Sequence, residues 1–218
     1  METMLAAFKE SQLIGREDEK SEIIKMISNR QNQKIEVISI CGMGGLGKTT
    51  LVKYVYQSQE LNAMFEKRAC VTIMRPFNPN ELLSSLATQL GANKEEANSD
   101  SLAGLLEGKK YFIVLDDISS TTEWDVIVKY FPTTVITSRI IITTREENIA
   151  MHCSKEDTNI YKLKFLGDKD ARSLFTEKVL IMPSLFCVEL SVCMHISIIT
   201  VYLGEYSIRA SLPVNCYN

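Results

Sequence analysis

The run Gly-Met-Gly-Gly-Leu-Gly-Lys-Thr-Thr at residues 42–50 constrains the fold of this chain more than any other feature. It fits the pattern G-x-x-x-x-G-K-[ST], whose fixed positions are Gly42, Gly47, Lys48 and Thr49. Residues 35–41 before it are apolar and largely β-branched, which favours a buried parallel strand. Residues 49–56 after it lack Gly and Pro and can continue as a helix. The sequence therefore predicts a phosphate-binding loop between a strand and a helix, and a glycine-rich turn without a ligand is the alternative.

The chemistry of such a loop follows from its residue types. Glycines allow the backbone to turn its N–H groups toward phosphate oxygens, and the positive end of the following helix adds to that field. We expect Lys48 to reach the β- and γ-phosphates of a nucleotide and the Thr49 hydroxyl to bind Mg²⁺. The loop alone does not distinguish one class of nucleotide-binding protein from another.

A second candidate feature is the run Lys-Lys-Tyr-Phe-Ile-Val-Leu-Asp-Asp at residues 109–117. Five apolar residues followed by two aspartates predict a buried strand that carries carboxylates to its C-terminal end, beside the phosphate loop. Asp116 is the expected Mg²⁺ partner, directly or through water, and Asp117 is the expected group that polarises the attacking water. The alternative is a strand that runs into an ordinary turn.

The strand predicted at residues 139–145 ends in Thr143, Thr144 and Arg145. A cation at this end of a parallel strand would point into the same crevice and sense the γ-phosphate, so Arg145 is a candidate catalytic residue. The alternative is a solvated residue on the following turn.

Strand and helix patterns alternate along the chain. Strands are expected at residues 35–41, 68–74, 109–117, 139–145 and 159–165. Helices are expected at 17–28, 49–56, from 79 to the stop at Gly91, 102–106, 121–131, 147–152 and 168–178. This alternation predicts an α/β fold with a mainly parallel five-stranded sheet. We expect the strand that carries Arg145 to insert beside the strand of the phosphate loop.

Composition excludes several other classes. The net charge of −3 gives no basic field for nucleic acid, so no nucleic-acid partner is expected. The cysteines lack a C-x-x-C pair, which favours free thiols in a reducing compartment over disulfides or a zinc site. Residues 1–10 lack the basic and apolar regions of a secretory signal, so we expect a cytoplasmic protein. A membrane anchor at residues 191–203 is disfavoured, because 13 residues are too few to span a bilayer.

Five motifs taken together resemble one family, the NB-ARC domain of plant NLR disease-resistance proteins, which are STAND-type nucleotide switches. They are Leu-Ile-Gly-Arg-Glu at 13–17, the run at 42–50, Tyr-Phe-Ile-Val-Leu-Asp-Asp-Ile at 111–118, Ser-Arg-Ile-Ile-Ile-Thr-Thr-Arg at 138–145, and Tyr-Lys-Leu-Lys-Phe-Leu with Asp-Ala-Arg-Ser-Leu-Phe within 161–175. The resemblance implies a three-layer P-loop NTPase with a STAND/AAA+-like strand order. It also implies ATP or ADP with Mg²⁺ as cofactors and other NLR proteins as possible partners.

The resemblance also implies roles for individual residues. Ile14, Gly15 and Arg16 would border the adenine. Asp116 and Asp117 would form the Walker B pair, with Thr49 and Asp116 at the metal, and Arg145 would be the first sensor. Phosphate contacts are implied for Gly42, Gly44, Gly45, Leu46, Gly47, Lys48, Thr49 and Thr50.

The resemblance gives the expected domain organisation. Residues 1–12 would be a linker or remnant, 13–179 the NB-ARC nucleotide-binding core, and 180–218 an atypical hydrophobic tail outside the family pattern. The Gly-Leu-Pro-Leu and Met-His-Asp motifs of the family do not follow Lys178, so a truncated switch with weak affinity and slow hydrolysis is expected. The alternatives are an interaction or decoy module that associates with full-length NLR proteins, and a non-functional truncated gene product.

Overall fold

The computed structural model describes residues 13–29, 35–93, 99–132 and 137–180. The chain divides into two compact units, residues 1–171 and 172–218, and the fold and site below belong to the first. The predicted remnant at 1–12 and the tail from 181 onward, with its disfavoured membrane anchor, lie outside the described residues. The predicted domain boundaries therefore stay predictions.

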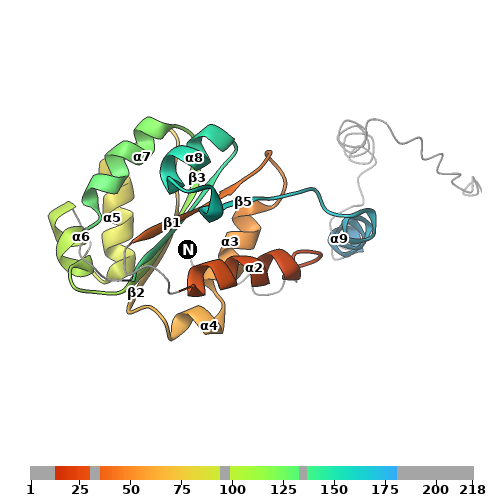
Figure 1. Cartoon of the computed structure of the whole chain (residues 1–218), viewed down its shortest axis with the longest axis horizontal. Coiled ribbons are helices and arrows are strands. Elements are labelled where there is room, and N and C mark those ends of the chain that lie inside the picture. The colour runs from red at the N-terminus through yellow and green to blue at the C-terminus, as the bar shows by residue number, and fades with distance from the viewer. Residues whose placement is uncertain (1–12, 30–34, 94–98, 133–136, 181–218) are drawn as a thin grey trace, which may run out of the picture. The chain divides into compact units, whose positions relative to one another are not determined.

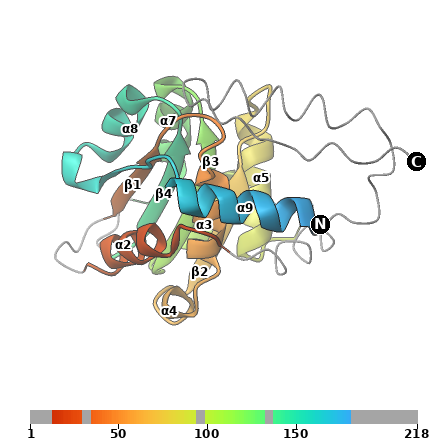
Figure 2. The same ribbon diagram turned by 90° about the vertical axis from the view of Figure 1, so that its right-hand side faces the viewer.

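The first unit is built on one sheet of parallel strands, as predicted. The strands are β1 (Glu36–Cys41), β2 (Lys67–Thr72), β3 (Tyr111–Ile118), β4 (Arg139–Thr144) and β5 (Ile160–Lys162). Their order in the sheet is β2-β3-β4-β1-β5, and every neighbouring pair is parallel. β4 thus lies between β1 and β3, which confirms the predicted insertion beside the strand of the phosphate loop (Figure 2).

Helices cover both faces of the sheet, so the sheet is the middle of three layers (Figure 1). On one face lie α2 (Glu17–Ser28), α3 (Lys48–Tyr56) and the short α4 (Gln59–Asn62). On the other lie α5 (Pro79–Leu90), α6 (Ser99–Leu106), α7 (Thr121–Ile127) and α8 (Glu147–Ser154). Short 3₁₀ turns follow α7 at Val128–Tyr130 and precede β5 at Asp157–Asn159, and α9 is Asp168–Leu180.

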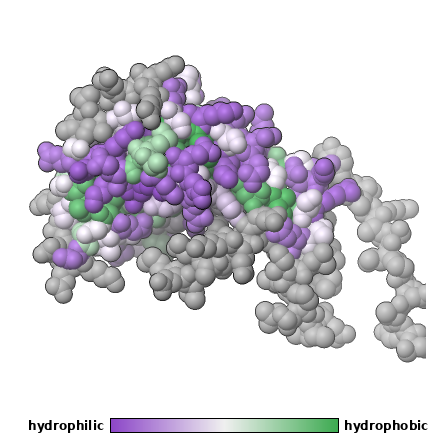
Figure 3. Space-filling model, turned by 90° about the horizontal axis from the view of Figure 1, so that it is seen from below, coloured by the Kyte–Doolittle hydropathy of each residue, from purple (hydrophilic) through white to green (hydrophobic). Residues whose placement is uncertain are grey.

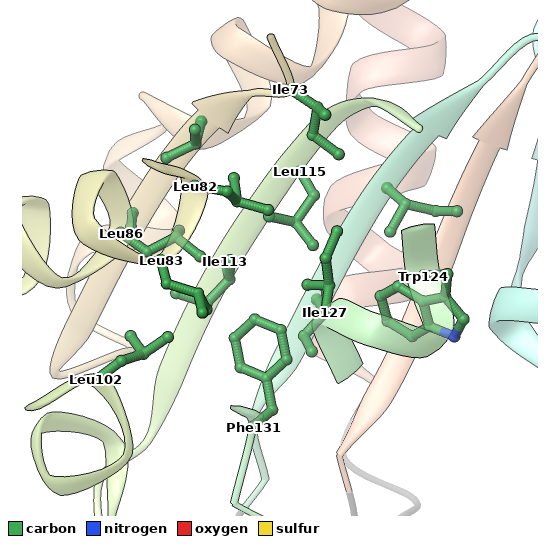
Figure 4. Packing of buried hydrophobic residues seen from close by; sticks show 14 of the residues in the cluster. Ile73, Leu82, Leu83, Leu86, Leu102, Ile113, Leu115, Trp124, Ile127 and Phe131 are labelled. Carbon is green, nitrogen blue, oxygen red and sulfur yellow. The ribbon is translucent and has the colours of Figure 1, made fainter. Parts of the chain in front are cut away.

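The apolar residues form two cores because side chains of a strand alternate between the faces of the sheet. On β3, Ile113 and Leu115 pack with α5, α6 and α7, where Leu83 and Trp124 are buried (Figure 4). The intervening Phe112 and Val114 pack with the residues of α2, α3 and α4 on the opposite face. The first charged residues of β3 are Asp116 and Asp117, close to its C-terminal end, and Asp116 is buried there.

Local signals define most element ends. The Asn78 side chain accepts hydrogen bonds from the backbone N–H groups of Asn80 and Glu81, and Gly91 ends α5 in the left-handed conformation. The helix expected over 121–131 ends at Ile127 and continues as one 3₁₀ turn, because Pro132 disfavours helical backbone at the residue before it. The strand expected over 159–165 is only three residues long, because it pairs with β1 alone and only at Ser39–Cys41.

The outer edge of β2 is closed by a side chain. The Gln89 side-chain amide accepts from the Cys70 N–H at 2.9 Å and donates to the Cys70 carbonyl oxygen at 3.1 Å. A second contact from β2 reaches the same helix, where the Lys67 ammonium donates to the Leu90 carbonyl oxygen at 2.8 Å. Helix α5 is thereby fixed along the edge of the sheet.

At the N-terminal end of β4, Arg139 joins α2 to the sheet. Arg139 is fully buried and forms an ion pair with Glu36 at 2.9 Å. Its guanidinium also donates to the carbonyl oxygens of Ile27, Ser138 and Asn29. A buried charge is tolerated only when it is paired and hydrogen-bonded, and this arginine satisfies both conditions.

One face of the described surface is mostly polar. Seen from below, it is largely hydrophilic, and hydrophobic residues form only small separated spots (Figure 3). Within the described part of the chain, no helix is both long and apolar enough to cross a bilayer. The three cysteines in that part, Cys41, Cys70 and Cys153, are free thiols, as predicted.

Candidate nucleotide site

The phosphate loop lies where the sequence predicts it, between the end of β1 at Cys41 and the start of α3 at Lys48. Gly47 caps the helix with a φ of +87°, a conformation that residues with a Cβ rarely adopt. A Cβ on Gly42 would lie 3.0 Å from the Leu163 carbonyl oxygen, so glycine also allows close packing against the chain after β5. The backbone at residues 42–47 therefore depends on its glycines for shape.

Lys48 is held inside this loop. Its ammonium group donates to the carbonyl oxygens of Gly42 at 2.5 Å and Met43 at 2.8 Å, and the residue is only 8% exposed. Burial lowers the pKa of Lys48, and the nearby Arg145 cation lowers it further. Two cations facing the same loop repel each other, and a bound anion would relieve that repulsion.

Asp116 is the centre of a hydroxyl cluster at the C-terminal ends of the strands. Its carboxylate accepts from Thr49 at 2.9 and 3.0 Å and from Thr143 at 2.6 Å. A weaker contact comes from Thr72 at 3.3 Å, and Asp116 is 1% exposed. Every one of these partners donates a hydrogen bond to the carboxylate, so hydroxyl groups from three separate elements fix its position.

A hydroxyl beside a carboxylate is a donor set that suits Mg²⁺, which prefers oxygen ligands and keeps several waters or phosphate oxygens in its shell. Among the described residues, no group of three or more His, Cys, Asp or Glu side chains could hold a metal ion by itself. Thr49 and Asp116 would therefore hold Mg²⁺ only together with a nucleotide, as in other phosphate-loop proteins.

Asp117 and Arg145 meet beside this cluster. Arg145 Nε lies 3.6 Å from Asp117 Oδ1, and both side chains are partly exposed. A Cβ on Gly44 would lie 3.7 Å from Arg145 Nη1, so the guanidinium also faces the phosphate loop. The structure thus brings both candidate catalytic residues to the loop, at the edge where the central strands β3, β4 and β1 end.

Arg16 connects three segments around the loop. Its guanidinium donates to the Leu46 carbonyl oxygen at 3.2 Å, to the Lys164 carbonyl oxygen at 2.7 Å and to Glu19 at 2.5 Å. Gly15 and Lys164 line a pocket of about 390 Å³ next to these contacts. Arg16 and Gly15 therefore lie at the phosphate loop, and the predicted adenine contacts of Ile14, Gly15 and Arg16 stay predictions.

The family model of the NB-ARC domain matches residues 16–184. The chain belongs to the NB-ARC family. Its similarity to curated proteins agrees. It is 32% identical to the disease resistance protein RPP13 of Arabidopsis thaliana, over 78% of this chain and 22% of that protein. It is also 32% identical to the ToMV resistance protein Tm-2(2) of Solanum lycopersicum, over 78% of this chain and 20% of that protein. The chain spans about a fifth of the length of these relatives.

Solved structures with the same fold are more distant. The crystal structure of Cdc6p from Pyrobaculum aerophilum aligns with a TM-score of 0.55 and 12% identity, over 78% of this chain and 51% of that one. The Aeropyrum pernix ORC2 protein, solved in ADPNP and ADP complexes, aligns with a TM-score of 0.51 and 20% identity, over 72% and 50%. At this identity the likeness shows the fold alone, which is the predicted P-loop NTPase architecture.

Two residues of the NB-ARC site had no role in the sequence analysis, although Thr143 lies within one of its motifs. Thr143 and Thr72 hold the Asp116 carboxylate, and Thr143 also accepts the Asp117 N–H at 2.8 Å. Their signal was the position of polar residues at the carboxyl ends of the strands next to β3, which becomes readable once the strand order is known. Thr50, predicted to contact phosphate, lies half-buried in the first turn of α3.

Proposed function

We propose that this NB-ARC chain binds ATP and ADP with Mg²⁺ and is the nucleotide-dependent switch of an NLR-type disease resistance receptor. One observation carries the proposal. The Thr49 hydroxyl at the start of α3 lies within 3.0 Å of the buried Asp116 carboxylate at the end of β3. Oxygen donors from two separate elements converge beside the glycine-rich loop, which is the arrangement that Mg²⁺ and nucleotide phosphates require.

The residues of the loop would act as follows. Lys48 would leave the carbonyl oxygens of Gly42 and Met43 and bind phosphate oxygens, and the N–H groups at the start of α3 would bind the same phosphates. When bound, Mg²⁺ would neutralise charge on the phosphates. Arg145 faces the loop from the end of β4, where a γ-phosphate would contact it and a diphosphate would not.

Arg145 therefore offers a way to distinguish ATP from ADP. The Arg145 guanidinium lies 3.6 Å from the Asp117 carboxylate. A γ-phosphate would compete with that carboxylate for the cation, and the released Asp117 would be able to accept a proton from an attacking water. A nucleotide shifts an equilibrium between two conformations only through contacts that differ between them, and a contact between Arg145 and the γ-phosphate would let ATP and ADP favour different conformations.

Titration calorimetry with Mg-ADP tests the proposal. Lys48→Ala should lower the affinity about 10- to 100-fold, since charge-assisted hydrogen bonds are worth about 1.5–3 kcal/mol. Lys53→Ala is the matched control, because it removes the other lysine of α3 and should leave binding unchanged. Equal binding by the Lys48→Ala variant and the parent chain would refute the proposal.

The same variant separates the proposal from the interaction-module alternative. If the parent chain binds no nucleotide but co-precipitates with a full-length NLR protein, and Lys48→Ala leaves that association intact, the chain acts as an interaction module. The signalling activity of a whole receptor is a further proposal, because the chain matches only 22% of RPP13.

A further inference from the structure

Asp117 has a backbone conformation that its surroundings must impose. Its φ is +69°, in the left-handed region that non-glycine residues rarely enter, and the pairing of β3 with β4 changes register between Leu115 and Ile118. Such a conformation is unfavourable for a residue with a Cβ and persists only where neighbouring contacts fix it. The contacts that fix Asp117 therefore determine where its carboxylate points.

Contacts from two sides hold the backbone of Asp117. On one side the Asp117 N–H donates to the Thr143 hydroxyl at 2.8 Å. On the other side Arg75 Nη2 donates to the Asp117 carbonyl oxygen at 2.6 Å. Arg75 follows the end of β2 and Thr143 lies on β4. The two hydrogen bonds to the Asp117 backbone therefore come from opposite sides of β3.

Arg75 is itself held by Glu123 in the first turn of α7. Its Nη1 lies 2.6 Å from Glu123 Oε1, so the two ends of one guanidinium bridge the Glu123 carboxylate and the Asp117 carbonyl oxygen. The Glu123 side chain is only 11% exposed. It also accepts from the Ser119 N–H and the Ser119 hydroxyl, each at 3.0 Å, and so fixes the chain two residues after Asp117.

Hydrogen-bond networks of this kind often only stabilise a fold, so a role at the nucleotide site depends on where this network ends. It ends on the residue whose side chain lies 3.6 Å from Arg145 and whose predecessor holds Thr49. A rotation of the peptide at Asp117 would move both carboxylates relative to the phosphate loop. We propose that Arg75 and Glu123 are positioning residues for the carboxylates that face Mg²⁺ and the nucleotide, an inference that rests on the proposed function.

The first test measures positioning without nucleotide. Hydrogen exchange on the full chain should show roughly tenfold faster exchange at residues 117–120 in Arg75→Ala, with the rest of the sheet unchanged. Glu123→Gln should have a smaller effect of the same kind, because it removes the charge but keeps an acceptor for Ser119. Lys109→Ala is the control, since it removes another surface ion pair, with Glu66 at 3.1 Å, before the start of β3. Unchanged exchange at 117–120 in Arg75→Ala would overturn the inference.

The second test measures the consequence for Mg²⁺. Affinity for ATP is determined with Mg²⁺ and with EDTA, and the ratio of the two reports the metal-dependent part of binding. Arg75→Ala should reduce this ratio roughly tenfold, the size typical of residues that orient metal ligands, while binding in EDTA stays unchanged. A merely structural role predicts weaker binding in both conditions with an unchanged ratio, and that result would overturn the inference. Arg75→Lys should recover little, since one ammonium cannot bridge both acceptors.

The two proposals fail in distinguishable ways. If the parent chain binds no nucleotide, the proposed function falls and the role toward Mg²⁺ falls with it, while the exchange experiment still decides whether Arg75 fixes Asp117. If the parent chain binds Mg-ATP and Lys48→Ala abolishes binding, the function stands, and the ratio measured for Arg75→Ala decides the inference alone.

Discussion

Substitution of Thr143 by Val should destabilise the fold far more than its conservative chemistry suggests. Valine has nearly the same shape as threonine but lacks the hydroxyl, and the Thr143 hydroxyl makes one buried and one partly buried hydrogen bond. It donates to Asp116 at 2.6 Å and accepts the Asp117 N–H at 2.8 Å. Loss of a hydrogen bond to a charged group costs about 1.5–3 kcal/mol, and an orphaned buried N–H costs about 1–3 kcal/mol.

Water reaches the half-exposed Asp117, so part of the second cost is recovered, and we expect a net loss of about 3 kcal/mol. Urea unfolding followed by circular dichroism measures this directly. With a slope near 2 kcal/mol/M, the unfolding midpoint should fall by about 1.5 M. Thr143→Ser keeps the hydroxyl and should lose much less. A loss below about 0.5 kcal/mol in Thr143→Val, or an equal loss in Thr143→Ser, would refute the two-contact reasoning.

Three further predictions follow from buried or strained residues. Arg139→Met should cost about 3–5 kcal/mol in urea unfolding because it removes one partner of the buried ion pair with Glu36, and the double variant with Glu36→Gln should recover part of that loss. Recovery of nothing would contradict the ion-pair explanation. Gly15→Ala should lower the melting temperature more than Gly108→Ala, since both glycines have nearly equal φ values of +66° and +65° but only the first would place its Cβ within 2.4 Å of another carbon. Equal shifts would mean that backbone strain alone matters. Burial, helped by the nearby Asp116 charge, raises the pKa of Cys70 to about 11. Fewer thiolates form at pH 8, so iodoacetamide should react with Cys70 roughly 100-fold more slowly than with a free thiol, and faster as the pH approaches 11; peptide mass mapping that finds fast labelling at pH 8 would contradict this.

The parts of the site that follow one another in the chain were predictable from the sequence. Lys48 and Thr49 sit in a pattern that leaves few backbone solutions, and the apolar run before Asp116 identifies its strand. The place of Arg145 also followed, because polar residues after the apolar run of a parallel strand lie at the carboxyl edge of the sheet. In each case a local pattern carries the information, since the contacts join neighbours in sequence or ends of adjacent strands.

Other parts were not predictable because they depend on contacts between distant residues. Arg75 and Glu123 are 48 positions apart, and neither stands in a motif, so no spacing indicates that they meet at Asp117. The length of β5 likewise depends on how far β1 extends beside it, which composition cannot reveal. The hydrogen bond from the Asp117 N–H to the Thr143 hydroxyl could not be predicted either, because it depends on the register in which β3 pairs with β4.

The pairing of Gln89 with the edge of β2 has a consequence for assembly. The Gln89 carboxamide presents an acceptor oxygen and an N–H donor to the same residue, so it satisfies the Cys70 N–H and carbonyl oxygen as a neighbouring strand would. The sheet is thus completed at Cys70 by a residue of its own chain, and another polypeptide that adds along β2 would first have to displace this amide. Gln89→Ala would leave the Cys70 N–H and carbonyl oxygen unpaired at the sheet edge, where the β2 strands of two copies could pair with each other. Gln89 therefore has two effects: it holds α5 against the sheet, and it opposes edge-to-edge aggregation of the domain through β2.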